Sequence, residues 1–237
     1  MMSDPHPYRR PLLVSFSGLD GSGKTTQINN LREVVARFGL RDQLLAFWDD
    51  AVVGTRYREG FVHKVYGSEK GIGAPDKPVN RKDKNVRAWY LTIARHGLYL
   101  LDAINLRRVI AAARRRGADV IIVDRYIYDE MANLPVEKAV SRAFIRLLNF
   151  VAPRPDVAYL LDADPEAARA RKPEYPVEFM HQSRRSYFRL SRLLGTMTVI
   201  PPLPLSDAKR EVERAFISKL GAAKSPPSPE FDTAPAA

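Results

Sequence analysis

The stretch from Gly18 to Thr25 has the residue types and spacing of a phosphate-binding loop. It reads GLDGSGKT and fits the pattern G-x-x-x-x-G-K-[ST], between an apolar run and a helix-like periodic segment. The glycines let consecutive backbone N–H groups face phosphate oxygens, and the helix N-terminus adds its positive end. The alternative is a glycine-rich turn without a ligand. We predict that the loop holds the phosphates of ATP through Gly18, Asp20, Gly21, Ser22, Gly23, Lys24, Thr25 and Thr26.

Two oxygen ligands for a metal ion accompany this loop. Lys24 is expected to reach the β- and γ-phosphates, and the Thr25 hydroxyl is expected to bind Mg²⁺, which prefers oxygen donors. Asp124 directly follows the apolar run 120–123, at the carboxyl end of a predicted central strand, where open parallel sheets bind ligands. We predict Asp124 as the second Mg²⁺ ligand, with capping of the next turn as the alternative role.

Arg125 stands beside this carboxylate and suits contact with a second phosphate. Its planar guanidinium can bind phosphate through two parallel hydrogen bonds. Two phosphates in line for transfer would explain an acidic and a basic residue side by side. We therefore predict Lys24 and Arg125 as catalytic residues, while a surface ion pair is the simpler alternative for Arg125.

Short apolar runs alternate with longer periodic segments, which is typical of strands and helices that build a parallel sheet. The predicted strands cover 12–16, 43–48, 120–123, 157–161 and 197–200, and the predicted helices cover 25–38, 86–116, 136–151, 165–172, 177–194 and 206–220, the last one capped by Ser206. The fold class is therefore α/β: a three-layer P-loop fold with a central, about five-stranded parallel sheet. We expect a flexible N-terminus at 1–11, one kinase domain at 12–221 and a disordered, Pro- and Ala-rich tail at 222–237.

Composition narrows the class of protein only a little. The chain of 237 residues has no cysteine and a net charge of +11, with 45% hydrophobic residues. Disulfides and thiolate metal sites are therefore impossible, and the positive field would attract anions without selecting one. No apolar run approaches the ~18 residues of a membrane span, so we expect a cytoplasmic protein.

Two motifs resemble the thymidylate kinases, a family of P-loop nucleoside monophosphate kinases. They are the run from Ser15 to Gln27 and the triplet Asp124-Arg125-Tyr126, and the order of elements is similar from about 12 to 220. The resemblance implies that Asp20 approaches the acceptor sugar and that Arg125 holds the acceptor phosphate. It also implies acceptor contact by Arg95, although an arginine on a helix surface is commonplace.

The run 167–172, AARARK, resembles the arginine-bearing lid of the bacterial thymidylate kinases. The resemblance implies a lid at about 169–180 that carries Arg169 and Arg171 to the γ-phosphate as catalytic cations. Such arginines stabilise the charge that moves during transfer, and a closing lid excludes water. Solvated surface charge is the alternative interpretation.

The acceptor half of the chain departs from that family. Phe47-Trp48-Asp49-Asp50 stands where the family has an arginine and a proline, and Leu91 replaces the stacking aromatic residue, although Trp89 and Tyr90 are adjacent. Asn133 and Leu134 occupy the base-contacting positions. We therefore predict phosphoryl transfer to a nucleoside monophosphate, with thymidylate (dTMP) as the leading guess, and keep another small-molecule acceptor, such as a nucleoside, as the alternative.

The expected partners are ATP and a small phosphorylated acceptor. A third hypothesis is a nucleotide-gated protein that holds nucleic acid through the basic segment 77–87, but this segment lacks interleaved aromatic residues for base stacking. Nucleic acid is therefore an unlikely partner. The family resemblance also implies a possible homodimer.

Overall fold

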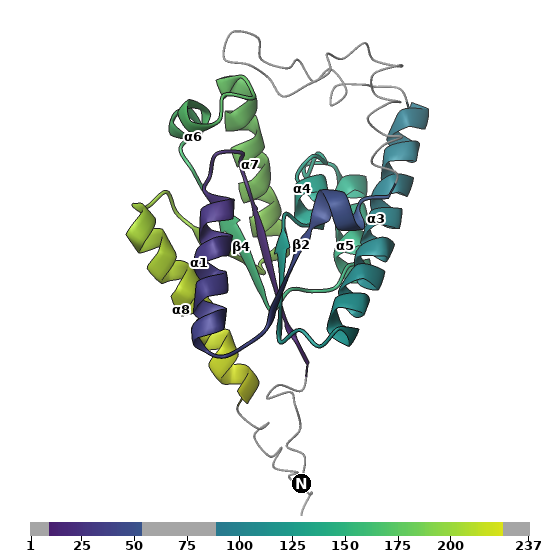
Figure 1. Ribbon diagram of the computed structural model, residues 1–237. Coiled ribbons are helices and arrows are strands. Elements are labelled where there is room, and N and C mark those ends of the chain that lie inside the picture. The colour runs from purple at the N-terminus through teal and green to yellow at the C-terminus, as the bar shows by residue number, and fades with distance from the viewer. Residues whose placement is uncertain (1–9, 54–88, 225–237) are drawn as a thin grey trace, which may run out of the picture.

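The computed structural model describes residues 10–53 and 89–224, and its strands and helices alternate along the chain (Figure 1). The strands are β1 (Leu12–Gly18), β2 (Asp42–Ala46), β3 (Val120–Asp124), β4 (Val157–Leu161) and β5 (Met197–Ile200). The helices are α1 (Lys24–Arg37), α3 (Trp89–Arg115), α4 (Ile127–Met131), α5 (Ala139–Val151), α6 (Pro165–Arg171), α7 (Val177–Leu194) and α8 (Leu205–Lys224), and η1 (Phe47–Ala51) is a single π-helical turn.

All the strands run parallel in one five-stranded sheet with the order β2-β3-β1-β4-β5. The register pairs Phe16 of β1 with Asp124 of β3, and Gly18 of β1 with Leu161 of β4. The chain leaves β1 towards β2 on one side and later returns to β4 on the other, so a crevice opens at the carboxyl ends of β1 and β3. The predicted α/β fold with a five-stranded parallel sheet is confirmed.

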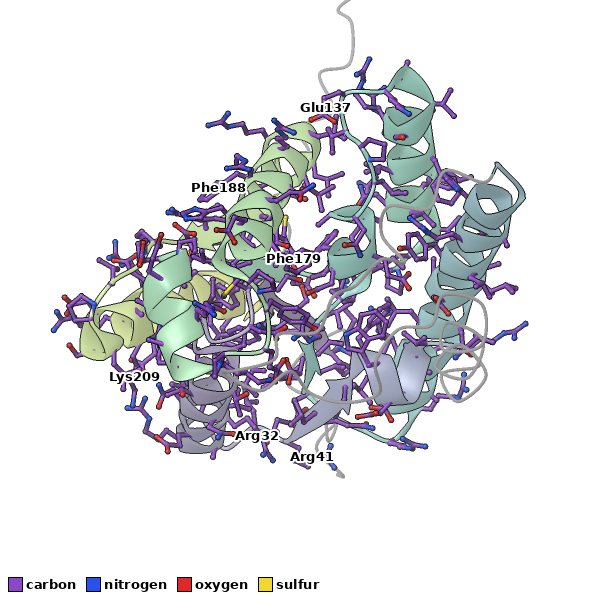
Figure 2. The ribbon with its side chains drawn as sticks, turned by 90° about the horizontal axis from the view of Figure 1, so that it is seen from above. Arg32, Arg41, Glu137, Phe179, Phe188 and Lys209 are labelled. Atoms are coloured by element: carbon purple, nitrogen blue, oxygen red, sulfur yellow. The ribbon has the colours of Figure 1, made fainter. Side chains whose placement is uncertain are left out.

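The sheet has a hydrophobic core on each face, because successive side chains of a strand point to opposite sides. In β1, Leu13 joins the core under α3, α4, α5 and α7, whereas Val14 and Phe16 join the core under α1 and α8. Seen from above, α1 and α8 lie on one side of the sheet and α3 and α5 on the other (Figure 2). The predicted three layers are therefore present.

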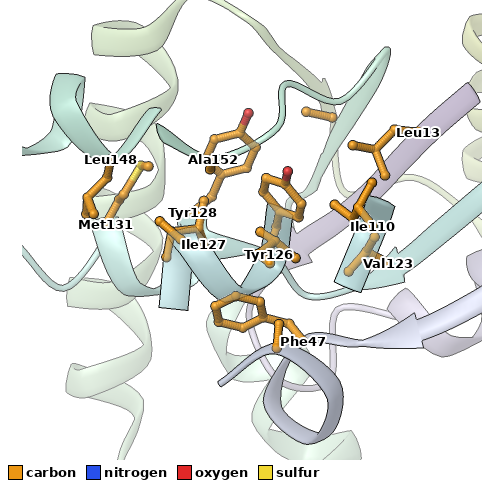
Figure 3. Packing of buried hydrophobic residues seen from close by; sticks show 14 of the residues in the cluster. Leu13, Phe47, Ile110, Val123, Tyr126, Ile127, Tyr128, Met131, Leu148 and Ala152 are labelled. Atoms are coloured by element: carbon orange, nitrogen blue, oxygen red, sulfur yellow. The ribbon is translucent and has the colours of Figure 1, made fainter. Parts of the chain in front are cut away.

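Aromatic and aliphatic side chains pack together in the core on the α3, α4 and α5 side of the sheet (Figure 3). Tyr126 and Phe47 are fully buried, and the ring centroids of Tyr126 and Tyr128 lie 5.0 Å apart. Tyr126 also donates a hydrogen bond through its hydroxyl to the carbonyl of Pro153. The residues that follow β3 are thus anchored by packing on one side of the sheet.

Several predicted boundaries are wrong. The second strand stops at Ala46, because the Asp50 carboxylate accepts a hydrogen bond from the Ala46 N–H at 2.7 Å and Phe47 turns into the core. The third predicted helix, 136–151, becomes helical only from Ala139, and the short helix α4 after β3 was not expected.

The structure describes residues beyond both ends of the predicted domain. Helix α8 begins at Leu205, so Ser206 lies inside its first turn and does not cap it, and it continues to Lys224, into the segment predicted as a disordered tail. Arg10, assigned to a flexible N-terminus, forms a 2.6 Å ion pair with Asp156. The predicted lid at 169–180 comprises the end of α6, a connection and the start of α7.

Within 10–53 and 89–224, no helix combines the length and the apolar character that crossing a membrane requires.

Helix α8 should contribute strongly to the stability of the domain. Its Phe216 is fully buried against the sheet, whereas the next residue, Ile217, is 44% exposed. We expect Phe216→Ala to lower the free energy of unfolding by about 3–5 kcal/mol, since it removes a buried aromatic ring and leaves a cavity. Ile217→Ala is the matched control and should cost less than about 1 kcal/mol. Urea denaturation of both variants measures the difference, and equal losses would contradict this packing.

Candidate functional site

The loop between β1 and α1 has the backbone geometry of a phosphate cradle. Gly18, Gly21 and Gly23 have φ angles of 140°, 79° and 87°, in the region that favours glycine. A Cβ at Gly18 would overlap the carbonyl oxygen of Leu161 at the end of β4, and a Cβ at Gly21 would overlap that of Ala168 in α6. The loop is therefore tightly packed between the sheet and α6, so only glycine fits at these two places.

The loop carries two polar side chains, Ser22 and Lys24, that could donate hydrogen bonds to an anion. The Ser22 hydroxyl is buried and has no hydrogen-bond partner in the part of the chain that the structure describes. Lys24 lies across the loop, where its Nζ donates to the carbonyls of Gly18 at 3.0 Å and Leu19 at 2.7 Å. Thr25 and Thr26 follow it on the exposed first turn of α1. This cradle fits the phosphates of a nucleotide, which accept hydrogen bonds from all such donors.

Burial changes the chemistry of Lys24. Its side chain is only 7% exposed, and this burial, together with the nearby charge of Arg125, lowers the pKa of Lys24 from 10.5 to about 8. The carboxylates of Asp20, Asp129 and Asp124 act in the opposite direction. The lysine is therefore close to losing its proton at physiological pH and would regain full charge beside an anion.

Asp124, the predicted second Mg²⁺ ligand, lies at the sheet edge that carries the P-loop. It ends β3 beside Phe16 of β1, and its charge acts on Lys24, the residue next to Thr25. No group of three or more His, Cys, Asp or Glu side chains gathers as a metal site among the described residues. One carboxylate and one hydroxyl suit Mg²⁺, which usually keeps several waters and takes few protein ligands beside phosphates.

Arg125 forms an ion cluster that the sequence did not reveal. Its backbone is left-handed, with a φ of 65°, and its N–H donates to the Phe16 carbonyl at 2.9 Å. This turn directs the guanidinium across the end of β1, where Nη2 pairs with Asp20 and Nη1 with Asp129 at 3.2 Å. The structure thus joins Asp20 and Arg125, both predicted from the resemblance, and adds Asp129.

The charges in this cluster stabilise one another. Burial raises the pKa of Asp20, but the positive charges of Arg125, Lys24 and Lys172 outweigh it and hold the pKa below its usual 3.8. Burial likewise lowers the pKa of Arg125, and the carboxylates of Asp129 and Asp20 more than compensate, so the pKa is raised. Both groups are therefore charged across the physiological range.

Asp129 is a site residue that sequence reasoning missed. It is 6% exposed and accepts hydrogen bonds from Ser17 Oγ, the Tyr126 N–H, Tyr187 Oη and Arg125. The sequence feature that could have indicated it is the position of Asp129, four residues after Arg125 and three after Tyr126. An acidic side chain three residues after the N-cap of a helix often accepts a hydrogen bond from the N-cap backbone N–H.

A second, partly buried ion pair lies at the end of β4. Arg184 of α7 donates to both oxygens of Asp162, at 2.7 and 2.6 Å. Sequence reasoning gave Arg184 no role. The pair fastens α7, which follows the predicted lid, to the sheet edge beside the P-loop.

The predicted lid arginines differ in their surroundings. Arg169 is half-buried, and its Nε is buried without a hydrogen-bond partner among the described residues. Arg171 is exposed, and its Nε donates to the Ala167 carbonyl at 3.2 Å. Both lie on α6, whose Ala168 touches Gly21 of the P-loop. Arg95 is half-buried near the start of α3.

The side chains at the two predicted base-contacting positions, Asn133 and Leu134, make contacts within the protein. Leu134 is buried in the core, and the Asn133 amide donates to the Asp129 carbonyl at 3.0 Å. The side chains of Leu91, Trp89 and Tyr90, and the basic segment 77–87, lie outside the described residues.

A pocket of about 570 Å³ lies away from this site, beside the amino ends of β1 and β4. Arginines and proline-rich loop residues line much of it, among them Arg10, Arg107, Arg114 and Arg154. We do not include it in the candidate site, because the P-loop and Arg125 are at the opposite, carboxyl edge of the sheet.

A scan of the chain against models of known protein families finds no match. The chain is 30% identical over 191 residues to the thymidylate kinase of Bifidobacterium longum subsp. infantis, and the alignment covers 76% of this chain and 74% of that relative. It is 24% identical over 212 residues to a probable thymidylate kinase of Methanosphaera stadtmanae, with 88% of this chain and 98% of the relative covered.

Among solved structures, the crystal structure of thymidylate kinase from Ehrlichia chaffeensis matches 89% of this chain and 99% of its own length, with a TM-score of 0.52 and 17% identity. At this identity the match shows a common fold. The Bifidobacterium relative adds sequence identity over most of both chains, in agreement with the two motifs that carry the resemblance. The chain therefore belongs to the thymidylate kinase family.

Proposed function

We propose that this protein transfers the γ-phosphoryl group of ATP to a nucleoside monophosphate, and that the acceptor is thymidylate (dTMP). The observation that carries the proposal is the ion cluster: a P-loop with Lys24 lies next to a second, partly buried cation, Arg125, at the same sheet edge. Two cations side by side suit two phosphates in line. The names of the relatives, thymidylate kinases, support dTMP as the acceptor.

Each residue has a distinct task in this proposal. Lys24 would leave the loop carbonyls and bind the β- and γ-phosphates, while Arg125 would hold the acceptor phosphate. Asp20, beside Arg125, would approach the acceptor sugar. The attacking phosphate oxygen is already anionic, so catalysis consists mainly of positioning and charge neutralisation.

Magnesium and the lid would complete the charge balance. Thr25 and Asp124 would hold Mg²⁺, which supplies neutralisation of the β- and γ-phosphate oxygens when bound. Arg169 and Arg171 would face the γ-phosphate, because α6 packs directly on the P-loop at Gly21. The unpartnered Nε of Arg169 supports a ligand-binding task for this side chain.

A second candidate keeps the kinase and changes the acceptor. Leu134 is buried and Asn133 already binds a backbone carbonyl, so two positions expected to read the base are occupied by the fold. This observation favours an acceptor with another base or without one, such as a nucleoside or another small metabolite.

We also propose a cytoplasmic enzyme, since the absence of cysteine suits a reducing compartment. That the protein forms a homodimer stays a prediction. That it does not bind nucleic acid also stays a prediction.

The acceptor can be tested with the purified protein, ATP, Mg²⁺ and a panel of acceptors. We expect ADP formation with dTMP and slower formation with dUMP, dCMP, dAMP and dGMP. Thymidine and water serve as controls for a nucleoside acceptor and for simple ATP hydrolysis. ADP formation with thymidine but with no monophosphate would replace the proposed function by the second candidate.

Removing the P-loop cation should abolish turnover. We expect Lys24→Ala to lower kcat/KM by at least about 1000-fold, because Lys24 is the one cationic residue of the loop sequence from Gly18 to Thr25. Lys219→Ala, on the exposed face of α8, is the matched control and should keep wild-type activity. Steady-state kinetics and thermal unfolding measure the two effects, and full activity of the Lys24 variant would remove the cradle from the mechanism.

The lowered pKa of Lys24 predicts a proton linkage. Above about pH 8 the free protein holds Lys24 increasingly neutral, and bound triphosphate favours the charged form, so binding takes up a proton and ATP affinity falls as pH rises. Calorimetry at about pH 8.5 in buffers of different ionisation enthalpy measures this uptake. Lys24→Arg, which stays charged, should abolish the uptake. An equal absence of uptake in the wild type would contradict the assignment.

A further inference from the structure

The Asp129 carboxylate is a buried junction at the acceptor end of the site. Its Oδ2 accepts from Ser17 Oγ at 2.8 Å and from the Tyr126 N–H at 3.1 Å. Its Oδ1 accepts from Tyr187 Oη at 2.6 Å and from Arg125 Nη1 at 3.2 Å. These donors come from β1, the turn after β3, and α7, so one side chain joins the strand before the P-loop to the helix after the lid.

This arrangement requires a carboxylate. Each oxygen accepts two hydrogen bonds, and an ionised carboxylate is a pure acceptor with room for both. An asparagine would offer N–H groups on one side, where they would face either the Tyr126 N–H or the Arg125 guanidinium, neither of which can accept a hydrogen bond. Since Asp129 is almost inaccessible to water, the lost bonds could not be replaced by solvent.

Asp129 also restricts where the Arg125 guanidinium can lie. Arg125 has Asp20 on one terminal nitrogen and Asp129 on the other, and its left-handed backbone is tied to Phe16. The carboxylates occupy one hydrogen on each terminal nitrogen, which leaves further N–H groups for a phosphate. Of the two carboxylates, Asp20 is assigned to the acceptor sugar, so only Asp129 would hold Arg125 while a substrate is bound.

We propose that Asp129 is a positioning residue, which fixes Arg125 for the acceptor phosphate and links it to α7. The proposal rests on the proposed function of Arg125. It assigns a role to a residue that acts through another side chain, without contact to the reacting atoms. The expected signature is a selective loss of acceptor affinity, because Asp129 is hydrogen-bonded to Arg125, whereas the Lys24 ammonium is hydrogen-bonded to the Gly18 and Leu19 carbonyls and feels Asp129 only through its charge.

The test compares KM values for both substrates in Asp129→Asn. We expect the KM for dTMP to rise by about 10- to 100-fold, since a misplaced guanidinium loses a charge-assisted bond, while the KM for ATP changes by less than about 3-fold. Asp129→Ser is the second variant; it removes the charge, and its single rotatable hydroxyl can donate to the Ser17 or Tyr187 hydroxyl, so it keeps the test valid should the asparagine variant fail to fold. An equal rise of both KM values, or none, would overturn the proposal.

Two controls separate positioning from stability. Ser17→Ala removes one hydrogen bond on Oδ2 but leaves the Arg125 pair, so it should lower thermal stability and leave the KM for dTMP within about 3-fold. Asp156→Asn makes the same chemical change at the far edge of the sheet, where Asp156 accepts from the Leu13 N–H at 2.8 Å. It should leave both KM values unchanged. A rise in the dTMP KM of either control would overturn the proposal.

A crystal structure of the asparagine or serine variant distinguishes this inference from the proposed function. We expect the Arg125 guanidinium to leave its place between the two carboxylates, and an unchanged position would overturn the inference even if dTMP is the acceptor. Conversely, a wild-type protein that phosphorylates no monophosphate would refute the proposed function, while a displaced Arg125 would still support the positioning role of Asp129.

Discussion

A largely buried ion cluster around Arg125 joins the carboxyl ends of β1 and β3 to the middle of α7. Burying the charges of Asp20, Arg125 and Asp129 is costly unless each is paired and hydrogen-bonded, and the structure meets that condition on every side. This free-energy cost disfavours other arrangements of the chain. A strand register shifted by one residue, or a different path after β3, would leave a charge unpaired. The cluster therefore specifies the geometry of the acceptor side more than it adds stability.

The P-loop is subject to a steric constraint that complements this electrostatic one. Gly18 lies against the end of β4 and Gly21 against α6, so the loop cannot widen without moving the sheet or the lid helix. Arg169 and Arg171 are carried by the same helix. The donor site and the predicted lid are consequently in direct contact, while Asp129 provides the corresponding link between the acceptor arginine and α7.

The backbone conformation of the predicted donor half could be anticipated from sequence, because it depends on a short contiguous motif. Gly18 to Thr25 contains both the turn and the helix start, so neighbours in sequence are neighbours in space. The acceptor half could not. Asp129 and Tyr187 are 58 residues apart in the chain, and they come into contact because α7 packs on the sheet beside α4. The sequence around either residue does not predict this hydrogen bond. The buried Leu134 likewise shows that a position aligned with a base-reading residue can serve the core instead.

The amino-acid sequence by itself determined the α/β class, the parallel sheet and the phosphate loop, since these follow from periodicity and from residues close together in the chain. It placed Asp124 and Arg125 correctly at a strand end. Only the tertiary structure decided which charges pair: the order β2-β3-β1-β4-β5 brings the turn after β3 against β1, and the left-handed backbone of Arg125 directs its side chain between Asp20 and Asp129. Such pairings depend on distances between strands, which no local pattern encodes.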